Sequence, residues 1–137
     1  MKIKQGLWTL ALLAVSVSAS AELVVVANPG VKFNSLPQAQ LTRLFLGQAG
    51  SYPDGSAAQP LDTSGSLRNT FYQEVLKRSP EQVEKYWARM IFTGKAQPPR
   101  QVRPGDLKTL VAETPGAISY MDSSQVDASV KVISVTP

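Results

Sequence analysis

LDTSGSLRNTF, residues 61–71, joins a short extended segment to a predicted helix through a turn that is rich in hydroxyl groups. Residues 63–66 (Thr-Ser-Gly-Ser) form the turn, and Arg68 follows in the first turn of the helix. The free amides and the positive dipole of a helix start can hold an anion. A serine at the same place can instead cap the backbone of its own helix. The stretch therefore predicts either an anion site or an ordinary helix cap.

Helices on the C-terminal side of this turn are predicted from apolar spacing and capping residues. Apolar residues recur along one face over residues 66–78, which predicts a helix. Ser-Pro-Glu-Gln at residues 79–82 has the pattern of a capping box and predicts a further helix that stops at Gly94. A proline-rich loop over residues 97–104 and a short helix over residues 107–113 are expected to follow.

The predicted strands lie at the two ends of the chain and before the hydroxyl-rich turn. Residues 23–27 (LVVVA) form a continuous β-branched run, which is typical of a buried central strand. Residues 58–62 predict a short strand, and residues 117–121 and 130–135 predict two closing strands.

The segment after the first predicted strand has a helical pattern. Ser35 is the predicted N-cap, Pro37 lies in the first turn, and Gly47 ends the helix in a left-handed conformation. Residues 52–55 (Tyr-Pro-Asp-Gly) predict a turn. The order β-α-β-α-α-α-β-β predicts one α/β domain in which helices cover a small mixed sheet.

The predicted core draws on most of these elements. Tyr72 and Tyr86 are expected at its boundary with exposed hydroxyl groups. The residues expected in the core are Val24, Val26, Leu44, Phe45, Phe71, Trp87, Ile118 and Val132.

Residues 1–21 have the pattern of a secretory signal peptide. Two lysines give a positive start, residues 7–17 are largely apolar, and Ala-Ser-Ala at residues 19–21 supplies a small-residue cleavage site. The apolar run is too short to span a bilayer, and a retained membrane anchor is the alternative. We therefore expect cleavage after Ala21 and a periplasmic domain over residues 22–137.

The composition excludes several classes of function. The chain has no histidine and no cysteine, which removes the usual general base, thiol nucleophiles and the commonest zinc ligands. Without Lys2 and Lys4, the 14 basic side chains become 12 against 10 acidic ones, and a net charge of +2 is too small for a nucleic-acid footprint. We therefore expect a protein that is not an enzyme and that uses no metal, no cofactor and no nucleic-acid partner.

Several short motifs occur in an order that resembles a known family. LFLG at residues 44–47 precedes the turn at residues 52–55, and the hydroxyl-rich turn follows at the expected distance. Tyr-Trp at residues 86–87, Phe-Thr-Gly at residues 92–94 and Pro-Gly-Ala-Ile-Ser-Tyr at residues 115–120 complete the series. The chain resembles the phosphate-binding proteins of bacterial ABC transporters, which have the type II periplasmic binding protein fold.

The phosphate loop of that family, Arg-Ser-Asp-Gly-Ser-Gly-Thr, aligns with residues 60–66. Pro60 replaces the arginine, Ser66 keeps the hydroxyl group of the threonine, and we infer that Arg68 supplies the missing cation. The resemblance implies that Asp62 accepts the proton of hydrogen phosphate. The candidate residues for binding phosphate or another oxyanion are Asp62, Ser64, Gly65, Ser66 and Arg68.

Full-length members of this family have two lobes, whereas this chain has the length of one. The resemblance implies a short, single-lobe protein that binds phosphate or a related oxyanion in ABC-type phosphate uptake or sensing. A membrane permease or another envelope protein is the implied partner. The alternative is a ligand-free envelope adaptor that kept the fold.

Overall fold

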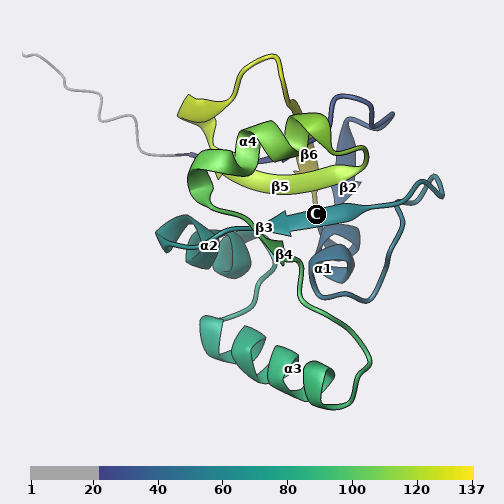
Figure 1. Ribbon diagram of the computed structural model, residues 1–137, viewed down its shortest axis with the longest axis vertical. Helices are drawn as coiled ribbons and strands as arrows, with labels where there is room; N and C mark the ends of the chain where they lie inside the picture. The colour runs from purple at the N-terminus through teal and green to yellow at the C-terminus, as the bar shows by residue number, and fades with distance from the viewer. Residues whose placement is uncertain (1–21) are drawn as a thin grey trace, which may run out of the picture.

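A mixed sheet of six strands forms the centre of the computed structural model, which describes residues 22–137 (Figure 1). The predicted signal peptide, residues 1–21, lies outside the described residues. The strands are β1 (Leu23–Ala27), β2 (Ser35–Pro37), β3 (Gln59–Asp62), β4 (Arg100–Gln101), β5 (Ala117–Asp122) and β6 (Lys131–Thr136). The helices are α1 (Gln38–Phe45), α2 (Ser66–Thr70), the π-helix η1 (Phe71–Val75), α3 (Pro80–Phe92), α4 (Pro104–Glu113) and the 3₁₀-helix η2 (Ser123–Gln125).

Strand β1 lies inside the sheet, whose order is β2-β6-β1-β5-β3-β4. It runs antiparallel to both neighbours, so that Val25 pairs with Tyr120 of β5 on one side and with Ile133 of β6 on the other. Val25, Val26 and Ala27 are buried. The prediction of a buried central strand from the run LVVVA is therefore confirmed.

The remaining strands pair in parallel: β3 with β5, β4 with β3, and β2 with β6. Because β3 lies between β5 and β4, its C-terminal residue Asp62 lies inside the sheet instead of at an edge. This pairing fixes the place where the hydroxyl-rich turn leaves the sheet.

Helices cover both faces of the sheet (Figure 1). On one face, Leu107 and Val111 of α4 form a core cluster with Val26. On the other face, α1, η1 and α3 supply a larger cluster, in which the ring of Phe71 stacks on Tyr120 with centroids 4.2 Å apart. The two clusters meet opposite faces of the sheet because successive side chains of a strand point to opposite sides.

Most of the predicted core residues are buried: Val26, Leu44, Phe45, Phe71, Trp87 and Ile118. Val24 is half-buried. Val132 is 48% exposed, so its prediction is wrong. The physical reason is that α4 contacts β1 and β5 and leaves the same face of β6 open, while the next residue, Ile133, points into the larger core cluster.

The helix predicted to begin at Ser35 begins later, and that prediction is wrong. Residues 35–37 form β2, which pairs with β6 and buries Leu36, and α1 follows Pro37 without a side-chain cap. An edge strand such as β2 tolerates a proline because one of its sides makes no ladder hydrogen bonds. Gly47 has a φ of 68° and ends the helical segment as predicted.

The two helices predicted after the hydroxyl-rich turn are both present. The first changes type, since α2 continues directly into the π-helix η1. The capping box of the second, α3, is confirmed: Ser79 Oγ accepts a hydrogen bond from the amide of Gln82 at 3.2 Å, and Gln82 Oε1 accepts one from the amide of Ser79 at 2.8 Å.

The segment predicted as a proline-rich loop contains structure of its own. Its residues Arg100 and Gln101 form β4, and α4 begins at Pro104, earlier than predicted. None of the helices within residues 22–137 is long and apolar enough to cross a membrane.

Candidate functional site

The hydroxyl-rich turn follows β3 and leads into α2. Ser64, Gly65 and Ser66 are all exposed. Gly65 has a φ of 104°, which side chains rarely adopt, and no neighbouring atom lies within 4 Å of the place where a Cβ atom would be. Glycine is therefore required by the backbone conformation of the turn and not by the space around it.

The turn does not cap its helix with a side chain. Gly65 is the N-cap residue of α2, and no side chain accepts a capping hydrogen bond. Within residues 22–137, the hydroxyl groups of Ser64 and Ser66 make no hydrogen bond, and the amides of residues 64–67 donate to no protein acceptor. The interpretation as an ordinary serine cap is therefore wrong, and the turn presents free donors to solvent.

Asp62 lies beneath this turn and is only 1% exposed. Its Oδ1 accepts hydrogen bonds from the amide of Thr63 at 2.9 Å and from the hydroxyl group of Tyr120. Its Oδ2 accepts from the hydroxyl group of Tyr72 at 2.7 Å and from Nε of Arg68 at 3.3 Å. A buried carboxylate is costly unless it is paired and hydrogen-bonded, and here both oxygens are satisfied.

The two tyrosines act as permanent donors to Asp62. Burial raises the pKa of Tyr72 and Tyr120, and the negative charge of Asp62 raises it further. Both hydroxyl groups therefore stay protonated throughout the neutral range, and the carboxylate keeps its hydrogen bonds.

Arg68 is held in place from two sides. Its Nε pairs with Asp62, and its guanidinium group lies over the ring of Tyr72, 4.6 Å from the centroid. From sequence, a cation in the first turn of a helix is unfavourable against the helix dipole; the pairing with Asp62 compensates for this. No hydrogen bond from the terminal amino groups of Arg68 to residues 22–137 is present, so these groups are available to a ligand.

Sequence analysis missed the two tyrosines around Asp62. Tyr72 is 1% exposed, so the prediction of an exposed hydroxyl group is wrong. The sequence signal that could have indicated them was Asp62, because an aspartate at the end of an apolar strand needs buried hydrogen-bond donors nearby. Thr63 was also not assigned a role; its Oγ1 is buried and has no hydrogen-bond partner within the described chain.

The exposed part of the site consists of hydrogen-bond donors and one guanidinium group. This donor set suits an oxyanion, which accepts hydrogen bonds and carries negative charge. In the described part of the chain, no group of three or more Asp or Glu side chains is placed to hold a metal ion.

The fold matches solved structures of substrate-binding proteins. An ABC-type phosphate transport receptor from Vibrio cholerae matches at 21% identity with a TM-score of 0.63, over 81% of this chain and 44% of that chain. PstS from Borrelia burgdorferi matches at 12% identity with a TM-score of 0.63, over 83% of this chain and 47% of that chain. A substrate-binding protein from Clostridium perfringens with bound phosphate matches at 21% identity with a TM-score of 0.62, over 82% and 44% of the two chains. No family model and no curated protein matches the sequence.

The sheet and its helices thus define an α/β domain with the fold of one lobe of a periplasmic binding protein. The structures that it matches include an ABC-type phosphate transport receptor and a phosphate ABC transporter substrate-binding protein, which confirms the fold predicted from the sequence motifs. The chain spans less than half the length of these proteins.

Proposed function

We propose that this protein binds phosphate or a related oxyanion on the hydroxyl-rich turn. Ser64, Gly65 and Ser66 donate hydrogen bonds to the oxyanion, and Arg68 neutralises its charge. One observation carries the proposal: the turn has donors without acceptors in residues 22–137, and the next cation along the chain is fixed by a buried carboxylate. The likeness of the fold to phosphate-binding proteins supports the same class of ligand.

Asp62 enters the proposal as a positioning residue. Its carboxylate is buried and already accepts four hydrogen bonds, two on each oxygen, so it acts on the oxyanion through Arg68. If Asp62 accepts the proton of hydrogen phosphate, as the resemblance implies, one of these donors must give way to the ligand. The buried hydroxyl group of Thr63 has no hydrogen-bond partner among the described residues, and a bound oxyanion would supply an acceptor.

The proposed setting is the periplasm, after export and removal of residues 1–21. There the protein would serve ABC-type phosphate uptake or sensing as a binding protein and not as an enzyme, with a membrane permease or another envelope protein as its partner. The support for this role is the fold, which is shared with an ABC-type phosphate transport receptor and with PstS.

Stabilisation by phosphate tests the proposal. A site on an open surface leaves part of the anion in water, so we expect a Kd of about 1 mM. At about 100 times this concentration, binding to the folded state alone raises the free energy of unfolding by about 2.7 kcal/mol. Thermal unfolding in phosphate, sulfate and chloride at matched ionic strength measures this effect, and phosphate should stabilise more than chloride.

Ser64→Ala tests the contribution of the turn to phosphate binding without changing the stability of the free protein. The Ser64 hydroxyl group is exposed and makes no hydrogen bond to the described residues, so the substitution should leave the free protein unchanged and reduce the effect of phosphate. Ser124→Ala, at another exposed serine, is the matched control and should keep the full effect. Equal stabilisation by phosphate and chloride would contradict the proposal and leave the ligand-free adaptor as the better interpretation.

A further inference from the structure

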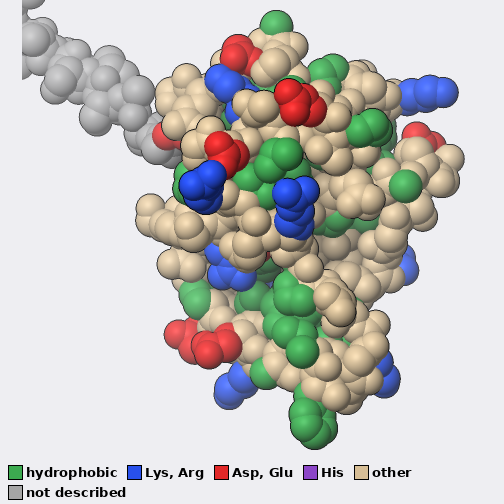
Figure 2. Space-filling view, in the orientation of Figure 1, with side chains coloured by type: hydrophobic (Ala, Val, Ile, Leu, Met, Phe, Trp, Pro, Cys, Tyr) green, Lys and Arg blue, Asp and Glu red, His purple; other side chains and the backbone are tan. Residues whose placement is uncertain are grey.

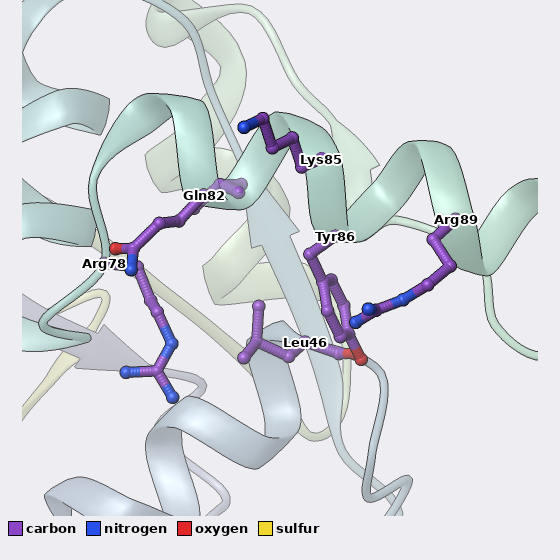
Figure 3. Close-up of a pocket in the computed structure, with 7 residues that line it drawn as sticks. Leu46, Arg78, Gln82, Lys85, Tyr86 and Arg89 are labelled. Carbon is purple, nitrogen blue, oxygen red and sulfur yellow. The ribbon is translucent and has the colours of Figure 1, made fainter.

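A surface cavity of about 290 Å³ lies between α3 and the end of α1 (Figure 3). Leu46, Val83 and the ring of Tyr86 form its floor, and the Tyr86 hydroxyl group donates a hydrogen bond to the carbonyl oxygen of Leu46 at 2.6 Å. Three cations surround this apolar floor: Arg78, Lys85 and Arg89. None of these residues belongs to the hydroxyl-rich turn.

The three cations are not paired with carboxylates in the described part of the chain. None of them forms a salt bridge with a carboxylate there, whereas Arg68, Arg103 and Lys108 do. Within residues 22–137, Arg78 donates only to the carbonyl oxygens of Leu76 and Lys77, at 3.4 and 3.3 Å. Like charges that gather around one cavity repel each other, and an anionic partner would relieve this repulsion.

An exposed aromatic side chain lies at the end of the same helix. Phe92, the last residue of α3, is 92% exposed, and the preceding Ile91 is 56% exposed. Lys85, Arg89 and Phe92 follow one another at spacings of four and three residues, which places them along one face of the helix. Hydrophobic side chains reach the surface at the end of the molecule where α3 lies (Figure 2).

We propose that this cavity and Phe92 form a docking surface for an acidic segment of a partner protein. Carboxylates of the segment pair with Arg78, Lys85 and Arg89, and an apolar side chain of the segment packs on the cavity floor and against Phe92. Arginine and aromatic side chains are enriched in protein–protein interfaces, and aromatic anchors there carry a large share of the binding energy.

The charges on α3 favour a narrow acidic segment over a bilayer. Glu81 and Glu84 are exposed on the same helix and form no salt bridge with the described residues. A flat anionic membrane that covered the helix broadly would meet both carboxylates, whereas a narrow segment that lies between Arg78, Lys85 and Arg89 would meet at most Glu81, which precedes Lys85 by one helical turn. A small inorganic anion would pair with the cations but would leave Phe92 in water.

The test is an NMR titration of the ¹⁵N-labelled protein with a short synthetic peptide that carries glutamates around a central leucine. We expect saturable shifts confined to Leu46, Arg78 and α3. Arg89→Gln should weaken binding about twofold to fivefold, as loss of an exposed ion pair does, and Phe92→Ser about tenfold, as loss of an aromatic anchor does. Both residues are exposed, so both variants should fold, which an unchanged melting temperature verifies.

The matched control is Lys108→Gln, which removes one positive charge from α4 and should leave peptide binding unchanged. Three outcomes would overturn the docking surface: shifts spread over the whole protein, equal weakening by Lys108→Gln and Arg89→Gln, or stronger α3 shifts with anionic vesicles or pyrophosphate than with the peptide. Ser64→Ala should leave peptide binding intact, so failure of this proposal is distinct from failure of phosphate binding at the turn.

Discussion

Asp62 connects the interior of the protein to the hydroxyl-rich turn. Its place at the end of a strand, next to the turn, could be predicted from the sequence, but its burial could not. This burial depends on Tyr72 in η1 and Tyr120 in β5, which the fold brings to the carboxylate from distant parts of the chain. The free amides of the turn could also not be predicted, because a serine cap and an anion site have the same local sequence.

Asp62→Asn should destabilise the protein markedly. The substitution removes the charge that pairs with Arg68 and places an amide NH₂ group among hydroxyl donors. Loss of one partner of a buried ion pair costs roughly 3–5 kcal/mol, and we expect about 3 kcal/mol because the Arg68 side chain is 28% exposed. Urea unfolding measures the loss. The control is Asp106→Asn, which breaks the exposed pair with Arg103 and should change the free energy of unfolding little. Equal losses in the two variants would contradict the stabilising role of the buried Asp62 carboxylate.

The buried tyrosines predict that stability falls at high pH. Burial, and then the charge of Asp62, raise the pKa of Tyr72 and Tyr120 above the ordinary value of 10.0. Their stabilising contribution is complete below that value. Above it, the unfolded chain loses protons that the folded chain keeps, and each tyrosine lowers the free energy of unfolding by about 1.4 kcal/mol per pH unit. Urea unfolding from about pH 8 to about pH 11 should show this decline, with a shallower slope in Tyr120→Phe; an unchanged slope would contradict the assignment.

At the scale of helices and strands, features that depend on neighbouring residues could be predicted from the sequence, whereas short strands that exist only through pairing could not. The capping box of α3 and the left-handed Gly47 could be predicted because each depends on residues close in sequence. Strands β2 and β4 could not, because they are short and exist only through pairing with β6 and β3. The open face of β6 at Val132 likewise depends on where α4 lies.

Phe71→Ala tests the junction between η1 and the sheet. Phe71 is fully buried, stacks on Tyr120 and contacts Phe45 with ring centroids 4.8 Å apart. Truncation of a buried phenylalanine costs roughly 3–5 kcal/mol, which denaturant unfolding measures. Phe92→Ala is the matched control, because Phe92 is 92% exposed and its truncation should cost almost nothing. Similar losses of unfolding free energy in the two variants would contradict the stabilising role of the buried Phe71 ring at this junction.

At the scale of the whole molecule, α3 projects from the rest of the structure in Figure 1 but is joined to the main core through Trp87. Trp87 is 7% exposed, and one of its ring carbons would lie 3.2 Å from a Cβ atom added to Gly47. This close approach ties α3 to the segment that follows α1.

The domain should therefore unfold as one cooperative unit. Trp87 is the only tryptophan in residues 22–137, so its fluorescence reports on α3, while far-UV circular dichroism reports on all helices and strands. We expect both signals to change at the same urea concentration. A fluorescence transition at a lower urea concentration would mean that α3 unfolds on its own.

The position of β1 inside the sheet has a consequence for biosynthesis. The first described strand completes its pairing only with β5 and β6, which are made about 90 residues or more later in the chain. Contacts between the two ends of a chain form slowly, since a long loop must close first. The central strands therefore cannot assemble before β5 and β6 have been synthesised, and until then the apolar residues of β1 have no strand to pair with inside the sheet.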